Sequence, residues 1–423
     1  MNRPQIAVLH YTAPPIVGGV EAVIQAHARA FTAAGYPVTV VAGRGEQSAH
    51  CPEAGFIGIP QMDSQHPDVA EASAELAQGR VPPNFDRLTD SLASALAQTL
   101  PRFDHLIAHN LFTKHFNLPL TAALCRLLDA GAIPHCIAWS HDFTWTSPSS
   151  RHMVHPGYPW DLLRSYRPDT TYVAVSQRRQ RELAALLACP PERIRVVYNG
   201  VDPQLLLGLS PTGYALIELL CLLESDLILL MPVRVTQAKN IECAMRVVAE
   251  LKAHLARPKL IVTGPPDPHD ERSRAYLRSL QALRQKLDIT DEMSFVFECG
   301  PDPDQPFTID VQIVGDLLRV SDMVFMPSHR EGFGMPLLEA GLVGAAVLST
   351  HIPAAEEIGQ GDVILFAAEE EPAHLAERIL TWAVASPVHR LRRRVRQHYT
   401  WSAIFQRDIR PLLEHGERQS DRP

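Results

Sequence analysis

Short apolar runs alternate along the chain with longer stretches in which apolar residues recur every three or four positions. In the first half, the short runs predict strands at Ile6–Tyr11, Val38–Ala42, His105–His109, His135–Trp139, Thr171–Val175 and Arg195–Tyr198. The longer stretches predict amphipathic helices at Val20–Ala34, Leu88–Leu100 and Arg178–Leu187. Strands that alternate with helices favour a mostly parallel sheet with helices on both faces.

The same pattern restarts after Asn199-Gly200, a pair of residues that favours a turn. We therefore expect an α/β fold with two doubly wound sheets joined near residues 203–226. The domains are predicted to span 1–205 and 206–385, with terminal helices at 386–423. Ligands of such sheets bind at the carboxyl ends of the strands, so the catalytic cleft is expected between the domains. The second set of strands is predicted at Leu227–Met231, Lys259–Val262, Ser294–Phe297, Met323–Met326, Ala346–Leu348 and Val363–Phe366.

Composition and charge narrow the class of protein. A chain of 423 residues fits two domains of about 200 residues each. The formal net charge of −8 argues against nucleic-acid binding, which needs a basic face. The 7 cysteines are scattered without a C-x-x-C pair, as in a cytoplasmic protein with reduced thiols. No apolar run reaches the roughly 20 residues that span a bilayer, and no secretory signal is evident.

A basic run at residues 390–396 contains five arginines in seven positions. Such a run can touch an anionic membrane, but it is more often a solvated helix face. We favour the solvated face, so at most peripheral membrane contact is expected.

Residues 331–341 form a glycine-containing turn with two carboxylates, Glu331 and Glu339, eight positions apart. The turn lies between two apolar runs and leads into a helix, which together predict a strand–helix–strand unit. A helix start offers unpaired N–H groups and the positive end of the helix dipole, and so favours an anion. Glu339 falls about two turns further along the helix. The alternative is a solvated carboxylate beside a helix cap, but a ligand with phosphates and hydroxyls, such as a nucleotide sugar, suits this arrangement.

This segment resembles the E-x7-E motif of the retaining glycosyltransferases of family 4, which have the GT-B fold. Further stretches extend the resemblance over nearly the whole chain, namely Gly18-Gly19-Val20-Glu21, Tyr172–Ser176, Arg193–Asp202, Leu229–Arg234 and Lys239-Asn240. The resemblance implies two Rossmann-like domains that face each other across a cleft, with a terminal helix from Trp401 crossing back to the first. It also implies a hexosyltransferase that moves a hexose, glucose or mannose, from a UDP- or GDP-sugar to an acceptor hydroxyl with retention of configuration.

The second half carries the candidate donor site. Arg234 and Lys239 follow a predicted strand, where their charges would stabilise the departing phosphate, and both match the family's phosphate-binding pair. Glu339 would accept hydrogen bonds from ribose hydroxyls, and Glu331 resembles the family's first Glu, near the donor sugar. The donor-binding segment at the helix start comprises Gly332, Phe333, Gly334, Met335 and Leu337, while Pro336 has no N–H to offer.

The first half carries weaker candidates. Gly18 and Gly19 follow the first strand and allow close approach of a phosphate. His141 follows another strand end and resembles the family's active-site histidine, with His109 as a second possibility. The loop Phe143–Asp169 is rich in aromatic and cationic side chains, so Trp160 and Arg164 are candidate contacts for the acceptor, or else the loop only packs its own aromatics. The expected acceptor is a sugar, a sugar acid or a lipid-linked sugar.

No metal and no cofactor is expected beyond the nucleotide sugar itself. Asp302-Pro303-Asp304 spells the D-x-D pattern of metal-dependent transferases, but it lies in a proline-rich loop away from the other motifs and is read as chance. No G-x-G-x-x-G is present, which disfavours a nicotinamide site. Two alternatives stay open: a disaccharide phosphorylase of the same fold, and a nucleotide-sugar-binding subunit without activity.

Overall fold

The computed structural model describes residues 3–49, 51–266, 271–300 and 307–414, and the chain forms two compact units. Unit 1 contains the chain up to Gly200 and again from Trp401 onward, and unit 2 runs from Val201 to Thr400. The division therefore falls at residue 200 rather than 205. Residues 386–400, predicted to belong with the terminal helices, are part of unit 2. The D-x-D pattern at 302–304 lies outside the described residues.

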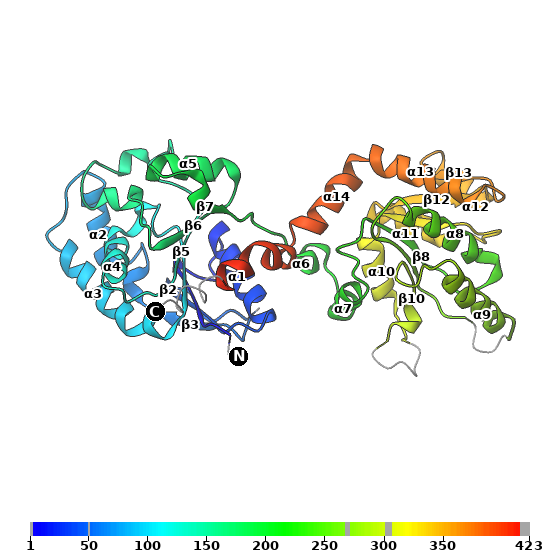
Figure 1. Cartoon of the computed structure of the whole chain (residues 1–423), viewed down its shortest axis with the longest axis horizontal. Helices are drawn as coiled ribbons and strands as arrows, with labels where there is room; N and C mark the ends of the chain where they lie inside the picture. The colour runs from blue at the N-terminus through cyan, green and yellow to red at the C-terminus, as the bar shows by residue number, and fades with distance from the viewer. Residues whose placement is uncertain (1–2, 50, 267–270, 301–306, 415–423) are drawn as a thin grey trace. The chain divides into compact units, whose positions relative to one another are not determined.

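Unit 1 is built on a seven-stranded parallel sheet in the order β3-β2-β1-β4-β5-β6-β7 (Figure 1). All seven residues of the central strand β1 are buried, and its first four residues form a continuous apolar run. The strands are β1 (Ile6–Thr12), β2 (Val38–Arg44), β3 (Gly55–Gly58), β4 (His105–His109), β5 (Cys136–Ser140), β6 (Thr170–Ala174) and β7 (Ile194–Val196).

Helices cover both faces of this sheet. One face packs against α1 (Gly19–Ala33) and the C-terminal segment, and the other packs against α3 (Phe85–Thr99), α4 (Leu118–Asp129) and α5 (Gln177–Leu187). A further helix, α2 (Pro67–Leu76), precedes α3. The C-terminal segment consists of α15 (Trp401–Ile404), a π-helical turn and α16 (Arg410–Glu414). Phe405 anchors it, with ring centroids 5.9 Å from Phe31 and 6.1 Å from Tyr36.

Unit 2 contains a six-stranded parallel sheet in the order β10-β9-β8-β11-β12-β13. Its strands are β8 (Leu227–Met231), β9 (Pro258–Val262), β10 (Met293–Phe295), β11 (Met323–Met326), β12 (Ala346–Thr350) and β13 (Ile364–Phe366). One face packs against α8 (Ile241–Lys252), α9 (Glu271–Lys286) and α13 (Pro372–Ala385). The other packs against α7 (Pro211–Leu219), α10 (Val311–Val320), α11 (Met335–Val343) and α12 (Pro353–Gly359), while α6 (Pro203–Leu207) opens the unit. The predicted doubly wound α/β architecture is confirmed in both units.

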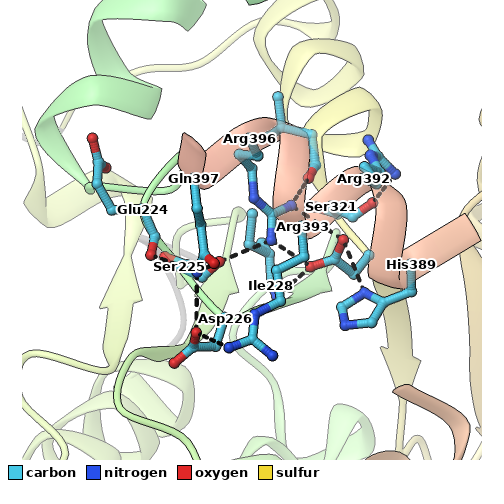
Figure 2. A network of polar contacts seen from close by, with 12 residues as sticks. Glu224, Ser225, Asp226, Ile228, Ser321, His389, Arg392, Arg393, Arg396 and Gln397 are labelled. Carbon is cyan, nitrogen blue, oxygen red and sulfur yellow. Dashed lines mark hydrogen bonds and ion pairs between the residues drawn. The ribbon is translucent and has the colours of Figure 1, made fainter. Parts of the chain in front are cut away.

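The basic run lies on α14 (Pro387–His398), and most of its arginine side chains contact other residues of unit 2. Figure 2 shows Arg392, Arg393 and Arg396 pointing from this helix toward the segments around Ser225 and Ser321. Arg396 is 7% exposed and contacts both carboxylate oxygens of Asp322 at 3.0 and 3.1 Å. The prediction of a solvated helix face is therefore wrong for these three arginines, although Arg394 is exposed. The run fastens α14 to the amino ends of β8 and β11, through Asp226 and Asp322 respectively.

Candidate functional sites in the two units

The candidate donor site lies where the strand order of unit 2 reverses. Chain order runs outward from β8 through β9 to β10 on one side, and from β11 through β12 to β13 on the other. Doubly wound sheets bind ligands at such a switch point, outside the carboxyl ends of the two central strands. Arg234 and Lys239 follow β8, and Glu331 follows β11. The sheet order therefore brings together residues that lie 92 positions apart in the sequence.

Lys239 and Glu331 form the direct link between these two loops. The Lys239 ammonium donates to Glu331 Oε1 at 2.6 Å, and the Ser328 hydroxyl donates to the same oxygen at 2.7 Å. The side chains of Lys239 and Glu331 are 21% and 9% exposed, respectively. The backbone adds a second link, since the N–H of His329 donates to the carbonyl of Ala238 at 2.9 Å. The two predicted residues are thus held in one arrangement before any ligand binds.

Arg234 differs from Lys239 because its guanidinium meets no hydrogen-bond or ion-pair partner among the described residues. Its backbone is closely packed by Gly264, where an added Cβ would lie 2.8 Å from the Arg234 Cα and 2.6 Å from the Val233 carbonyl oxygen. Only glycine fits there without moving backbone. The loop is therefore fixed in place while the cationic side chain is left available for an anion.

The start of α11 matches the predicted anion site in part. Gly334 caps the helix with φ of 83°, a left-handed conformation that glycine adopts without strain. In the described part of the chain, the N–H groups of Gly332 and Phe333 donate to no backbone carbonyl. Leu337 was expected to bind the donor, but its N–H donates to the Gly334 carbonyl and its side chain is 5% exposed in the core. We therefore assign Leu337 to packing.

Three other side chains of this segment remain accessible. Phe333 and Met335 are 60% and 54% exposed, and Glu339 is half-buried on α11. The Glu339 carboxylate accepts no hydrogen bond from the residues that the structure describes. An ionised carboxylate with unused lone pairs is suited to accept hydrogen bonds from vicinal hydroxyls.

The second candidate site lies at the switch point of unit 1, between β1 and β4. A cavity of about 610 Å³ opens there, and it is lined by residues from the carboxyl ends of β1, β4 and β5 and from the starts of α1 and α5. Of the predicted residues, Gly19 and His141 line it. The other polar residues that line it are not among the predicted site residues, namely His10, Glu21, Asn110, Lys114, Asp142, Ser176, Arg179 and Asn199.

Three histidines in this region are linked by hydrogen bonds. His10 Nδ1 lies 2.9 Å from the carbonyl oxygen of His109, and His109 Nδ1 lies 3.1 Å from His141 Nε2. The Asn110 side chain accepts from the backbone N–H groups of His141 at 2.8 Å and Asp142 at 3.3 Å, and so fixes this turn. His109 is fully buried and does not line the cavity, so it reaches a ligand only through His141.

Burial keeps these histidines uncharged. It lowers the pKa of His141 to about 4, with a smaller effect from the charge of His10. Burial also lowers the pKa of His10 and of His109, in each case against the ordinary value of 6.5. At neutral pH the site therefore presents neutral imidazoles, which can donate and accept hydrogen bonds but carry no charge.

The two glycines after β1 have different surroundings. A Cβ on Gly18 would lie 2.1 Å from Oε2 of Glu21, whose other oxygen accepts from the Thr12 hydroxyl. Gly19 has no atom within 4 Å of an added Cβ and lines the cavity. Gly18 therefore makes room for the Glu21 carboxylate, whereas Gly19 leaves space for a ligand.

Among the described residues that line the cavity, one cation, Lys114, has no anionic partner. Arg179 pairs with Asp142 at 3.0 Å and with Glu182 at 2.9 Å. Lys114 has no ion-pair partner in the described chain, and its ammonium lies 4.7 Å from the ring centroid of Phe116. Burial lowers the pKa of Lys114 from its ordinary value, and Arg179 adds to this while Asp142 opposes it. A half-buried ammonium of this kind is suited to an anionic ligand group.

The loop Phe143–Asp169 packs its own aromatic residues. Trp160 is 3% exposed in a cluster with Trp145 and Leu163, and the Arg164 guanidinium lies 4.1 Å from the Trp145 ring centroid. Arg164 also pairs with Asp161 at 2.8 Å. These side chains are thus engaged in packing within the loop, the alternative that the sequence left open, and they offer little to an acceptor.

Among the described residues no cluster of histidine, cysteine, aspartate or glutamate has the arrangement of a metal site. In the same residues no helix has the length and apolar character needed to cross a membrane.

Two Rossmann-like units, each with a polar site at its switch point, define the class of protein. The model of the family described as Glycosyltransferase Family 4 matches residues 17–205, and that of Glycosyl transferases group 1 matches residues 222–398. The two matches together cover most of the chain. The chain belongs to the group 1 glycosyltransferases of the GT-B fold, which confirms the resemblance.

Individual relatives are distant. The mannosylglucosylglycerate synthase of Petrotoga mobilis is 24% identical over 264 residues, which are 59% of this chain and 60% of that protein. The D-inositol 3-phosphate glycosyltransferase of Jonesia denitrificans is 26% identical over 198 residues, 43% of this chain and 40% of that protein. The match thus spans about 60% of the first relative's length and less of the second. Sucrose-phosphate synthase from Thermosynechococcus elongatus aligns over 99% of this chain and 98% of that one, with 16% identity and a TM-score of 0.36.

Proposed function

We propose that this protein is a retaining hexosyltransferase, which moves glucose or mannose from a nucleotide diphosphate sugar to an acceptor hydroxyl without a metal ion. The observation that carries the proposal is the pair of cationic side chains at the β8/β11 switch point. Arg234 has no partner in the described chain, and Lys239 is held by Glu331. Family membership supports the class of reaction.

In the proposed reaction, the bond between C1 of the hexose and the phosphate oxygen breaks as the acceptor oxygen attacks from the same face. The acceptor proton passes to the departing phosphate oxygen, so no enzyme nucleophile is needed. Arg234, Lys239 and the N–H groups at the start of α11 stabilise the charge that grows on the phosphate. Glu339 accepts hydrogen bonds from the ribose hydroxyls.

The neutral wall of the unit 1 cavity suits sugar hydroxyls, and Lys114 suits an acidic group on the acceptor. The names of two relatives include glycerate and inositol 3-phosphate, which carry a carboxylate and a phosphate. We therefore extend the proposal to an acceptor with a carboxylate or a phosphate. The activity is expected inside the cell, in the cytoplasm, where nucleotide sugars are available.

The first experiment measures thermal stabilisation by UDP, GDP and ADP with excess chelator present. A ligand that binds only the folded protein raises its stability by an amount set by its concentration relative to Kd. We expect one nucleotide to stabilise the protein, Arg234→Ala to lose most of that shift, and the exposed Arg246→Ala on α8 to keep it. No shift with any nucleotide, or equal shifts in both variants, contradicts the donor site.

The second experiment identifies the reaction. The stabilising nucleotide is used to choose the donor, which is incubated with sugars, sugar acids and sugar phosphates, and the product is examined by NMR. We expect an α-linked product from an α-linked donor. An inverted product disproves retention, and a product that forms only with inorganic phosphate and a disaccharide favours the phosphorylase.

A further inference from the structure

The histidines beside the unit 1 cavity are arranged so that the position of their protons can be deduced. Each neutral imidazole carries one N–H and one bare nitrogen, and which nitrogen carries the proton is set by its hydrogen-bond partners. His109 is the central ring, because its carbonyl oxygen meets His10 and its Nδ1 meets His141. The remaining nitrogen of His109, Nε2, is buried and has no partner among the described residues.

The His109 ring is packed against aromatic neighbours. The His109 ring lies 5.8 Å from the Trp139 ring and 5.3 Å from the His27 ring, measured between centroids, and both neighbours are fully buried. A proton on Nε2 would be a buried N–H without an acceptor, which is rarer in folded proteins than a buried lone pair without a donor. A proton on Nδ1 has an acceptor 3.1 Å away, at His141 Nε2. The favoured arrangement therefore has His109 protonated at Nδ1.

The proton on His109 then determines the state of His141. If His109 Nδ1 donates, His141 Nε2 must be the bare nitrogen, and the single proton of the neutral His141 ring lies on Nδ1. No described residue meets His141 Nδ1, and His141 lines the cavity. We propose that His109 is a positioning residue that fixes His141 as the Nδ1–H tautomer, so that the cavity wall offers a hydrogen-bond donor to an oxygen atom of the ligand.

His10 supplies the complementary group. Its Nδ1 faces the carbonyl oxygen of His109, which only accepts, so Nδ1 carries the His10 proton. The bare His10 Nε2 lies 4.0 Å from Glu21 Oε1. Two acceptors that face each other at this distance leave a place for a ligand group that donates, and His10 and Glu21 both line the cavity.

The chemical class of the ligand follows from this wall. A donor at His141 and acceptors at His10 and Glu21 suit hydroxyl groups, which donate and accept, better than ammonium groups, which only donate. In the proposed transferase, which this inference presupposes only for the identity of the ligand, these are sugar hydroxyls. A deoxy sugar that lacks the hydroxyl at this wall leaves a buried donor or acceptor unpaired, and is expected to react about tenfold or more slowly.

The test reads the tautomer directly and needs no activity. Long-range ¹H–¹⁵N spectra of protein labelled at histidine distinguish Nδ1–H from Nε2–H rings, and the His141 signals are assigned by their loss in His141→Gln. We expect wild-type His141 to be protonated at Nδ1 near pH 7 and His109 likewise. A His141 ring protonated at Nε2, or at both nitrogens, overturns the proposal even if the protein is an active transferase.

Two variants of equal shape test the role of His109. The amide N–H of His109→Asn can replace the Nδ1 donor, whereas the carboxylate of His109→Asp only accepts when ionised. We expect Asn to preserve the His141 tautomer and to keep kcat/KM within about threefold, and Asp to move the proton to His141 Nε2 and reduce kcat/KM about tenfold or more. The exposed His152→Asn serves as the control.

Equal spectra in the Asn and Asp variants contradict the positioning role. If Asp at this buried place prevents folding, the wild-type spectrum still decides the tautomer. A correct tautomer in a protein that transfers no sugar leaves the arrangement of protons intact and instead disproves the proposed function.

Discussion

Lys239 and Glu331, which are 92 positions apart in the sequence, meet at 2.6 Å across the two central strand ends of unit 2. This pairing changes what each residue can do. Lys239 brings less net charge to a phosphate than Arg234 does, because it is already paired with the Glu331 carboxylate. Arg234 has no hydrogen-bond or ion-pair partner in the described part of the chain, so the two residues are not equivalent in anion binding.

Replacing Glu331 with Gln is expected to separate binding from transfer. The change removes the negative charge beside Lys239, so nucleoside diphosphate binds as tightly as before or more tightly. Turnover is expected to fall about a hundredfold, because Lys239 loses the carboxylate that fixes its ammonium group in position. Calorimetry with the free nucleotide and steady-state kinetics measure the two effects. Weaker nucleotide binding with unchanged kcat is the result that contradicts the assignment.

Glu339→Gln is expected to weaken binding of the free nucleotide and of the donor nucleotide sugar by the same factor, about tenfold. The reason is that the ribose contact is the same in the ground state and the transition state. Titration of both ligands measures this. The exposed Glu357→Gln on α12 is the matched control. A loss of transfer without a loss of nucleotide affinity would give Glu339 a different role.

Lys114, rather than the loop Phe143–Asp169, is now the residue expected to contact the acceptor. We expect Lys114→Gln to raise KM for an acceptor with a carboxylate or phosphate about tenfold or more, since one charged hydrogen bond is lost. Arg164→Ala, whose side chain stacks on Trp145, is the comparison, and it is expected to change stability rather than acceptor KM. These kinetics use the acceptor found in the product screen. A larger rise in acceptor KM for Arg164→Ala than for Lys114→Gln would mean that the acceptor binds at the loop Phe143–Asp169.

Removing Arg396 is expected to destabilise unit 2 strongly. Its partner Asp322 has a side chain that is 1% exposed, and Arg396→Ala leaves this carboxylate with fewer partners, at a cost of about 3–5 kcal/mol. Arg394→Ala on the same helix is exposed and is expected to change stability by less than about 0.5 kcal/mol. Urea unfolding of the two variants makes the comparison.

The same network predicts acid sensitivity. Burial alone would raise the pKa of Asp322, but Arg396 and His389 outweigh it and lower this pKa to about 2. The stabilisation is therefore present above the ordinary pKa of about 4 and is lost as the pH falls toward 2. Equal stability of Arg396→Ala and Arg394→Ala in urea contradicts the role of the buried pair of Arg396 and Asp322.

His27 is expected to make unit 1 less stable in mild acid. It is fully buried without a hydrogen-bond partner among the described residues, and burial lowers its pKa to about 3, with a smaller effect from His141. Because the unfolded chain takes up a proton near pH 6.5 and the folded one does not, stability is complete above that pH and falls below it by about 1.4 kcal/mol per unit. At pH 5 the loss is about 2 kcal/mol.

His27→Leu removes this loss, so its stability relative to the wild type is expected to rise steadily between pH 6.5 and 5. Urea unfolding at several pH values measures the slope. The exposed His152→Leu is the control and is expected to follow the wild type. A parallel pH dependence in His27→Leu and the wild type would show that His27 takes up its proton at the same pH in the folded and unfolded states, which contradicts a lowered pKa.

The positions of most strands are determined by the sequence alone. The predicted strands His105–His109 and Leu227–Met231 agree with β4 and β8 at both ends, because parallel strands buried on both faces read as apolar runs bounded by turns. The helix α4 escaped prediction because ten of its residues are buried on all sides, which leaves no periodic pattern to read. The edge strand β3 contains two glycines in four residues, so its apolar run is only Phe56-Ile57, which is too short to predict a strand.

The family and the candidate donor residues also followed from the sequence, since Arg234, Lys239 and Glu331 stand in local motifs next to strand ends. Their pairing did not, because it depends on β8 lying beside β11. The same is true of His10, His109 and His141, which meet only because β1, β4 and β5 are neighbours.

The basic run on α14 looked like a solvent-facing helix for a similar reason, since the carboxylates that bind it, Asp226 and Asp322, lie far away in the chain. Local propensity and hydrophobic periodicity act over a few residues and so are written in the sequence, whereas contacts between strand ends depend on the order of the sheet, which only the tertiary structure decides.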